Sequence, residues 1–320
     1  MLFPRRASLH REAYSYCILL SICAVTLVHH FWTTTTTIYQ NIQYLHLQDA
    51  QPPDSNSIPK VIWYKLGPKG LNKDTQEWTD SCITANPQYE AQFLTDEDAD
   101  DFVKTAFVNR PDILEAYLGL TVPILKADLL RYMLLFDQGG VWSDLDVSCS
   151  NIPIDDWIPS RYVDDAGVVV GLEFDVGWAS GIIRQFASWT FMAKPGSPHM
   201  LTVIEDIVEA LQSTMQEYQV PVENVTVAMT GDVVDFSGPR RLTTGILRSL
   251  GYKLNRTVDQ DEVSEILQPK MIGDVLVMPG RSFAASANRY PVEQEEQLPP
   301  SLVTHHYAGT WKNVHGGESL

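Results

Sequence analysis

The pattern of apolar and polar positions between residues 124 and 147 changes its period once. In the first half, apolar residues recur at helical spacing, at Leu125, Leu129, Tyr132, Met133 and Phe136. This spacing predicts a helix that presses one apolar stripe against a core. We expect it to begin at Pro123 and to end at Gly139-Gly140, because proline suits a first helical turn and glycine takes the left-handed conformation that ends a helix. From residue 141 to 147 the period is two, which predicts a strand with Trp142, Asp144 and Asp146 on one face and with Val141, Ser143, Leu145 and Val147 on the other.

Short apolar runs alternate with helical patterns along the rest of the chain. The runs at 58–66, 90–94, 168–174 and 274–279 predict strands, and the stretches 78–83, 182–192 and 199–218 predict helices, the second of them amphipathic. Alternation of this kind predicts an α/β domain with a mostly parallel sheet, whose ligands collect beyond the carboxyl ends of the strands.

The first 57 residues have a different composition. Residues 1–15 contain Arg5, Arg6 and Arg11, and residues 16–32 are apolar, which predicts a cytosolic tail and a signal-anchor transmembrane helix with the rest of the chain in the lumen. A cleaved signal peptide is the alternative. Residues 33–57 are threonine-rich and then polar, a composition typical of a stem, so a catalytic domain is expected at 58–320.

Length and charge narrow the class of protein. The chain has 320 residues, 44% of them hydrophobic, enough for one large α/β domain with a real core. The net charge of −17 argues against a general affinity for nucleic acid, because phosphate repels an acidic surface.

Asp144 and Asp146 are the leading candidates for a metal site. Hard divalent cations such as Mg²⁺ and Mn²⁺ prefer oxygen ligands and are often held by one or two carboxylates plus substrate phosphates. The same spacing occurs at Asp96/Asp98, Asp98/Asp100 and Asp259/Asp261, but those pairs lie in polar runs. A carboxylate in an otherwise apolar segment needs a cation or hydrogen-bond partners to offset its burial, so structural carboxylates are the alternative.

The segment LKADLLRYMLLFDQGGVWSDLDV resembles the central block of the family 32 glycosyltransferases, which are DxD-type enzymes that use nucleotide sugars. The resemblance implies a single Rossmann-like GT-A type domain. It also implies that Asp128 and Arg131 contact the donor sugar, while Asp144 and Asp146 hold a cation on the diphosphate. Without the family, Asp128 and Arg131 would be interpreted as an ion pair on a helix surface.

Other segments extend this resemblance. The opening Ile-Pro-Lys-x-Ile-Trp implies that Val61, Ile62 and Trp63 lie near the base, with core packing as the alternative for Trp63, and Gly140 is included among the donor-binding residues. The segment 304–312 resembles the family's closing His-His motif. This implies a histidine as a further metal ligand, with His305 the first candidate and His306 the second. It also implies that Lys312 neutralises the departing diphosphate. Residues 189–198 resemble the family's tryptophan helix and Lys-Pro-Gly-x-Pro loop. Gly238-Pro239 resembles a Thr-Gly-Pro-Gly segment, but Ser237 replaces the threonine and Arg240 the last glycine.

The implied reaction is metal-dependent transfer of a hexose with retention of configuration. The expected cofactor is Mn²⁺ or Mg²⁺, and the expected donor is GDP-mannose. The acceptor would be a glycan, as for the alpha-1,6-mannosyltransferases of the family. The enzyme would be a type II protein of the Golgi membrane, with its catalytic domain in the lumen. A sphingolipid or small-molecule acceptor, or UDP-galactose as donor, is the alternative within the family. A glycoside hydrolase and a non-catalytic sugar-binding membrane protein are the alternatives outside it.

Two further features depend on a luminal location. Cys82 and Cys149 could form one disulfide there, which sequence leaves open. Asn224 and Asn255 begin glycosylation sequons.

Overall fold

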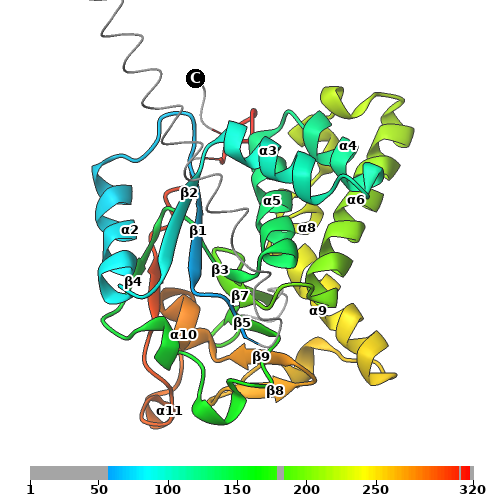
Figure 1. Cartoon of the computed structure of the whole chain (residues 1–320). Coiled ribbons are helices and arrows are strands. Elements are labelled where there is room, and N and C mark those ends of the chain that lie inside the picture. The colour runs from blue at the N-terminus through cyan, green and yellow to red at the C-terminus, as the bar shows by residue number, and fades with distance from the viewer. Residues whose placement is uncertain (1–56, 179–183, 310, 318–320) are drawn as a thin grey trace, which may run out of the picture. The chain divides into compact units, whose positions relative to one another are not determined.

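A mixed sheet forms the centre of the computed structural model, which describes residues 57–178, 184–309 and 311–317 (Figure 1). Its strand order is β2-β1-β3-β7-β5-β9-β8, and β6 pairs with β5. The strands are β1 (Val61–Lys65), β2 (Glu90–Leu94), β3 (Gly140–Ser143), β5 (Val168–Glu173), β6 (Gln185–Phe186), β7 (Thr190–Ala193), β8 (Lys270–Ile272) and β9 (Val275–Met278). Strands β1, β2, β3, β5 and β9 share one direction, and β6, β7 and β8 oppose it. The predicted α/β domain with a mostly parallel sheet is therefore confirmed.

Both faces of this sheet are buried, so its strands are nearly continuous apolar runs. Trp63 and Trp142 are register partners that face one core, and their neighbours Ile62 and Val141 face the other. The first core is covered by α3 (Asp96–Ala106), α4 (Pro111–Gly119), α5 (Pro123–Asp137), α6 (Pro198–Tyr218) and α9 (Pro239–Leu254). The second core lies under α10 (Gly280–Ala284) and the antiparallel pair β4 (Val147–Cys149) and β10 (Val303–His305). In Figure 1 these two groups of elements lie on opposite sides of the sheet.

Helix α5 has the predicted bounds but a different environment. It begins at Pro123, and the chain beyond it turns through Gly139 (φ +67°) and Gly140 (φ +101°). A Cβ at Gly140 would come 2.9 Å from the carbonyl oxygen of Val61, so glycine also permits close packing of β3 on β1. The prediction that α5 buries a single apolar stripe is wrong, because the sheet packs on one side of α5 and α6 packs on another. Residues all round α5 are buried, including Asp128 and Arg131.

Two predicted elements differ in the structure. The strand expected at 141–147 ends at Ser143, where its pairing with β7 stops, and a turn over Asp144, Leu145 and Asp146 leads to β4. The amphipathic helix expected at 182–192 is replaced by β6 and β7 within the described residues. Strand β7 fills the space between β3 and β5, so tertiary pairing outweighs the local pattern.

The remaining elements complete the described part of the chain. Helix α2 (Lys73–Ala85) packs on β4, and a Cys82–Cys149 disulfide joins them, which answers the question that the sequence left open. Short helices are α7 (Val227–Thr230), α8 (Val233–Phe236) and α11 (Val292–Glu295). The strands predicted at 58–66, 90–94, 168–174 and 274–279 are β1, β2, β5 and β9, and the helices predicted at 78–83 and 199–218 are α2 and α6.

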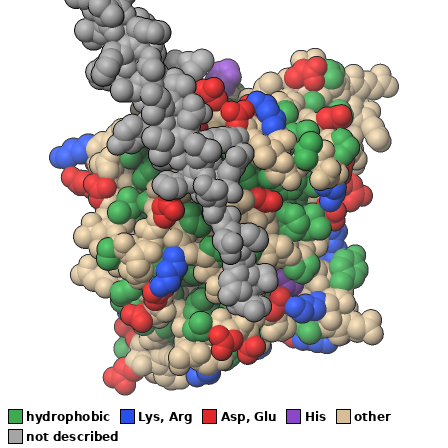
Figure 2. Space-filling view, viewed as in Figure 1, with side chains coloured by type: hydrophobic (Ala, Val, Ile, Leu, Met, Phe, Trp, Pro, Cys, Tyr) green, Lys and Arg blue, Asp and Glu red, His purple; other side chains and the backbone are tan. Residues whose placement is uncertain are grey.

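The predicted cytosolic tail (1–15), transmembrane helix (16–32) and stem (33–57) lie outside the described residues, apart from residue 57. Within the described ranges no helix has the length and apolar character to cross a membrane. Figure 2 shows acidic side chains spread over the visible face of the described residues, with basic ones between them.

Candidate functional site

The Asp-x-Asp pair lies in the turn that follows β3, at the carboxyl end of that strand. Asp144 Oδ1 accepts a hydrogen bond from Trp142 Nε1 (2.7 Å) and lies 3.6 Å from Arg131 Nη2. Asp146 Oδ2 accepts one from the backbone N–H of Ala308 (2.9 Å) and lies 3.3 Å from His305 Nε2. The side chains of Asp144 and Asp146 keep 28% and 16% of their exposure, so both remain within reach of a ligand.

Asp128 and Arg131 form a buried ion pair directly behind this turn. Their side chains are 4% and 5% exposed, with Asp128 Oδ1 2.8 Å from Arg131 Nη2, so the helix-surface interpretation is wrong. Arg131 also donates through Nη1 to the carbonyl of Ser188 (2.6 Å) and lies over the Trp142 ring. Ser237 donates from Oγ to Asp128 Oδ2 (2.7 Å). The serine that departs from the family pattern therefore fixes the second oxygen of Asp128.

The two carboxylates of the turn differ in their electrostatics. Burial raises the pKa of Asp144 to about 6, Asp146 adds to the rise, and Arg131 opposes it. Burial alone would raise the pKa of Asp146 as well, but hydrogen bonds and charge from His305 and the N–H of Ala308 bring that pKa below its ordinary value. Burial also raises the pKa of Asp128, against the pull of Arg131 and Ser237. Negative charge in this site is thus unevenly stabilised, as is common at functional sites.

The end of β10 and the residues that follow it lie against the turn. They bring the ring of one of the two predicted histidines to it. The backbone N–H of His306 donates to the carbonyl of Asp146 (2.8 Å), and the His305 ring stacks on Trp189 (ring centroids 4.2 Å apart). The ring of His306 stacks instead on Trp78 of α2 (4.1 Å), and its Nε2 lies 2.8 Å from Ser148 Oγ. His305 is therefore the histidine whose ring contacts a carboxylate of the Asp-x-Asp pair.

Asp144, Asp146 and His305 are the residues predicted to hold a cation. Within the described ranges, no three His, Cys, Asp or Glu residues are grouped so as to hold a metal ion, so Asp144, Asp146 and His305 do not form a ready three-ligand centre. Two carboxylates nevertheless suit Mn²⁺ or Mg²⁺ when a diphosphate supplies further oxygens. The residues fit a cation that arrives with its donor, and the metal role of all three stays a prediction.

The other predicted donor-binding residues lie in two places. Val61, Ile62 and Trp63 belong to β1, where Ile62 and Trp63 are buried and Trp63 Nε1 donates to the carbonyl of Gly139 (2.8 Å). These contacts are packing contacts, and those of Gly140 with Val61 are as well. Lys312 is exposed in the segment after β10. Donor binding by these residues stays a prediction.

Glu173 belongs to the same neighbourhood and was not predicted as a site residue. It ends β5 at 3% exposure, where Oε2 accepts a hydrogen bond from Gln185 Nε2 (2.7 Å) and Oε1 lies 3.4 Å from the Tyr307 hydroxyl. Burial raises its pKa to about 7, against the influence of Gln185, His305 and Lys312. A charged residue at the carboxyl end of the apolar run VVVGLE is the signal that could have revealed it.

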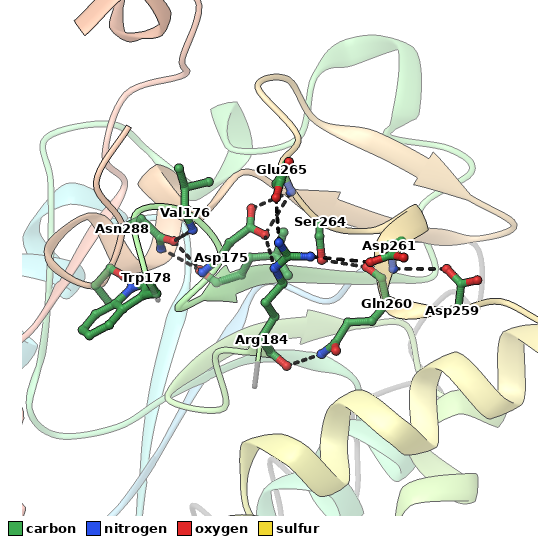
Figure 3. Close-up of polar contacts among 12 residues, drawn as sticks. Asp175, Val176, Trp178, Arg184, Asp259, Gln260, Asp261, Ser264, Glu265 and Asn288 are labelled. Carbon is green, nitrogen blue, oxygen red and sulfur yellow. Dashed lines mark hydrogen bonds and ion pairs between the residues drawn. The ribbon is translucent and has the colours of Figure 1, made fainter. Parts of the chain in front are cut away.

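The carboxylate two residues further on has a structural role. Asp175 accepts the backbone N–H of Glu265 with both oxygens (2.9 Å each), and Arg184 Nε lies 3.8 Å away (Figure 3). Asn288 accepts the N–H groups of Asp175 and Val176, and Trp178 donates to the carbonyl of Ala287. This network ties the chain after β5 to the segments around residues 265 and 288.

The Asp-x-Asp turn and the buried Asp-Arg pair, which carry the resemblance to nucleotide-sugar glycosyltransferases, lie together at the carboxyl edge of a mostly parallel sheet. Residues 72–164 match the family described as "Glycosyltransferase sugar-binding region containing DXD motif". The chain is therefore a glycosyltransferase, as the motif resemblance predicted, which sets aside the hydrolase and non-catalytic alternatives.

Relatives support this assignment over most of the chain. It is 29% identical over 308 residues to the initiation-specific alpha-1,6-mannosyltransferase of Candida albicans, covering 87% of this chain and 77% of the relative. It is 26% identical over 274 residues to the protein of the same name from Schizosaccharomyces pombe (83% and 66% covered). Among solved structures, PaToxG Glycosyltransferase superposes with a TM-score of 0.44 at 17% identity, covering 62% and 73% of the two chains, too weakly for an inference.

Proposed function

We propose that this chain transfers mannose from GDP-mannose to a glycan, forming an alpha-1,6 linkage. The names of its relatives support the sugar and the linkage. The observation that carries the proposal is the buried Asp128–Arg131 pair beside Asp144, because burying two charges is costly and charges fixed in this way are suited to stabilise charge that develops on a ligand.

Each residue has a task in this proposal. Asp144 and Asp146 would hold Mn²⁺ or Mg²⁺, which would supply Lewis-acid stabilisation of the leaving diphosphate. Asp128, fixed by Arg131 and Ser237, accepts hydrogen bonds from hydroxyls of the donor sugar. Lys312 is exposed and free to approach the departing diphosphate. The acceptor hydroxyl forms its bond to the anomeric carbon on the face from which the diphosphate leaves and gives its proton to that diphosphate, so the configuration is retained without a protein nucleophile.

A secretory location fits the same proposal. The Cys82–Cys149 disulfide is typical of an oxidising compartment. Asn224 and Asn255 are exposed and available for glycosylation. A Golgi enzyme anchored by residues 16–32, with its catalytic domain in the lumen, would meet both conditions.

The decisive experiment compares donors. The purified full chain is incubated with GDP-mannose, UDP-galactose and UDP-glucose in the presence of Mn²⁺, first alone to record slow donor hydrolysis and then with mannose oligosaccharides and a sphingolipid as acceptors. We expect consumption of GDP-mannose and an alpha-1,6-linked product on the oligosaccharide by NMR. Preference for a UDP-sugar, or transfer to the lipid alone, would contradict the proposal.

A further inference from the structure

Glu173 lies at the same edge of the sheet as the Asp-x-Asp turn. Strands β3 and β5 are both antiparallel to β7, which lies between them, so β3 and β5 run in one direction and their carboxyl ends meet at one edge. Ligands of open α/β sheets collect beyond this edge. Glu173 therefore ends its strand where a substrate is expected.

A continuous series of contacts joins Glu173 to the turn. The hydroxyl of Tyr307 lies 3.4 Å from Glu173 Oε1, and the ring of Tyr307 lies 4.0 Å from that of His305, which contacts Asp146. Tyr307 has φ +50°, a left-handed conformation that is uncommon for residues other than glycine and is found often at functional sites. The segment after β10 thus spans from the Asp-x-Asp turn to Glu173.

The bonding of Glu173 is incomplete for a buried carboxylate. A carboxylate has about four lone-pair sites, but within the described residues this one accepts a bond of 2.7 Å from Gln185 and makes a long contact of 3.4 Å with Tyr307. No basic side chain of the described residues lies within ion-pair distance, although His305 and Lys312 are near enough to act on it electrostatically. Another buried carboxylate, Asp175, accepts the N–H of Glu265 with both oxygens and lies near Arg184.

From this geometry we infer that Glu173 is a substrate-binding carboxylate that accepts a hydrogen bond from a sugar hydroxyl. The inference rests on the proposed function, because only a sugar-transferring site brings such hydroxyls to this edge. Two sugars could supply the hydroxyl: the hexose of the donor and the terminal residue of the acceptor. The remaining lone pairs of the carboxylate could accept a hydrogen bond from either sugar. Tyr307 limits the directions from which a hydroxyl can approach these lone pairs.

Two variants of the full chain test this inference. Glu173→Gln keeps the size of the side chain and removes its charge, and Glu173→Asp keeps the charge but withdraws it by one methylene. We expect kcat/KM for transfer to fall by about 10- to 100-fold in Glu173→Gln, the factor that corresponds to a lost hydrogen bond to a charged group. A smaller fall in kcat/KM is expected in Glu173→Asp. This second variant keeps the inference testable if Glu173→Gln does not fold.

The source of the hydroxyl follows from donor hydrolysis without acceptor. If the donor supplies it, hydrolysis falls as much as transfer does. If the acceptor supplies it, hydrolysis stays at the wild-type rate and the KM for acceptor rises. Asp206→Asn is the matched control, since Asp206 is a buried carboxylate on α6, and it should lower thermal stability without changing either KM.

Wild-type values for both reactions in a folded Glu173 variant would overturn the inference. The wild-type enzyme is assayed first with the donor panel, and the variants are then assayed with whichever nucleotide sugar it consumes. A wild type that prefers a UDP-sugar contradicts the proposed donor but leaves the variant ratio meaningful, so the two failures can be told apart.

Discussion

At the residue scale, the site consists of charged groups with unequal surroundings. Asp128 and Arg131 are buried and paired with each other, whereas Asp144 and Asp146 keep some exposure. Preorganised charges need no rearrangement when charge develops on a ligand, which is how such sites favour a transition state. The more exposed pair, Asp144 and Asp146, is then suited to bind a ligand. The buried pair is suited to fix the orientation of that ligand.

Asp144→Asn should reduce kcat for transfer by about 100-fold or more, because a neutral amide binds a divalent cation more weakly than a carboxylate does, and the leaving diphosphate then loses its stabilisation. The change is isosteric, so the thermal unfolding temperature should stay close to that of the wild type. Asp261→Asn is the control, since Asp261 belongs to another Asp-x-Asp pair and its side chain is 92% exposed. Full activity in purified Asp144→Asn would refute the assigned role.

Ser237→Ala should destabilise the protein by about 1.5–3 kcal/mol, the usual contribution of a hydrogen bond to a charged group, because Asp128 loses the partner of its Oδ2. The KM for donor should rise as well, since Asp128 becomes free to rotate. Chemical denaturation and donor titration measure the two effects. Ser237→Thr keeps the hydroxyl and should retain most of the donor affinity, and an equal loss in both variants would argue against the hydrogen bond as the cause.

At the element scale, ion pairs connect the helical layer to the edge of the sheet. Asp274, in the turn between β8 and β9, lies 3.0 Å from His199 of α6 and 2.8 Å from Lys253 of α9. Burial would raise the pKa of Asp274, but His199 and Lys253 together hold it well below its ordinary value. The carboxylate therefore joins three elements that the sequence places far apart.

A lowered pKa makes this contribution sensitive to acid. A carboxyl group whose pKa is lower in the folded state than in the unfolded state adds stability above its unfolded pKa of about 4, and loses it as the pH falls toward the folded value. Asp274→Asn should therefore lower the free energy of unfolding at about pH 7, with a difference from wild type that narrows below about pH 4. Denaturant titrations across this range provide the measurement, and a difference that is independent of pH would contradict the linkage.

At the scale of the whole molecule, we expect the predicted metal site to be completed by the substrate. Within the described ranges no three protein ligands are grouped so as to hold a metal ion, so a cation on the two carboxylates of the turn would need diphosphate oxygens to complete its coordination. This predicts cooperative binding of cation and nucleotide, since each supplies ligands or charge that the other lacks.

The protein should gain little thermal stability from Mn²⁺ alone or from GDP with EDTA, and several degrees from Mn²⁺ and GDP together. Ligands that bind only the folded state stabilise it by mass action, so the shift in unfolding temperature reports binding. Differential scanning fluorimetry of the full chain measures it, with Asp144→Asn as the variant that should lose the combined shift. An equal shift with GDP and EDTA would show that the nucleotide binds without the cation.

Several features could be predicted from the sequence: the class of fold, the helix and glycines before the turn, and the Asp-x-Asp pair, whose metal role stays a prediction. Local signals sufficed there, because period, proline and glycine positions, and a specific motif are all readable within short windows. The tertiary structure was needed to show that Asp144 and Asp146 occupy a turn, that residues 190–193 form a strand, and that Asp128 and Arg131 are buried. It also brought Glu173 to Tyr307, 134 positions away in the chain. Pairing partners and burial come from distant segments, so no window of the sequence contains them.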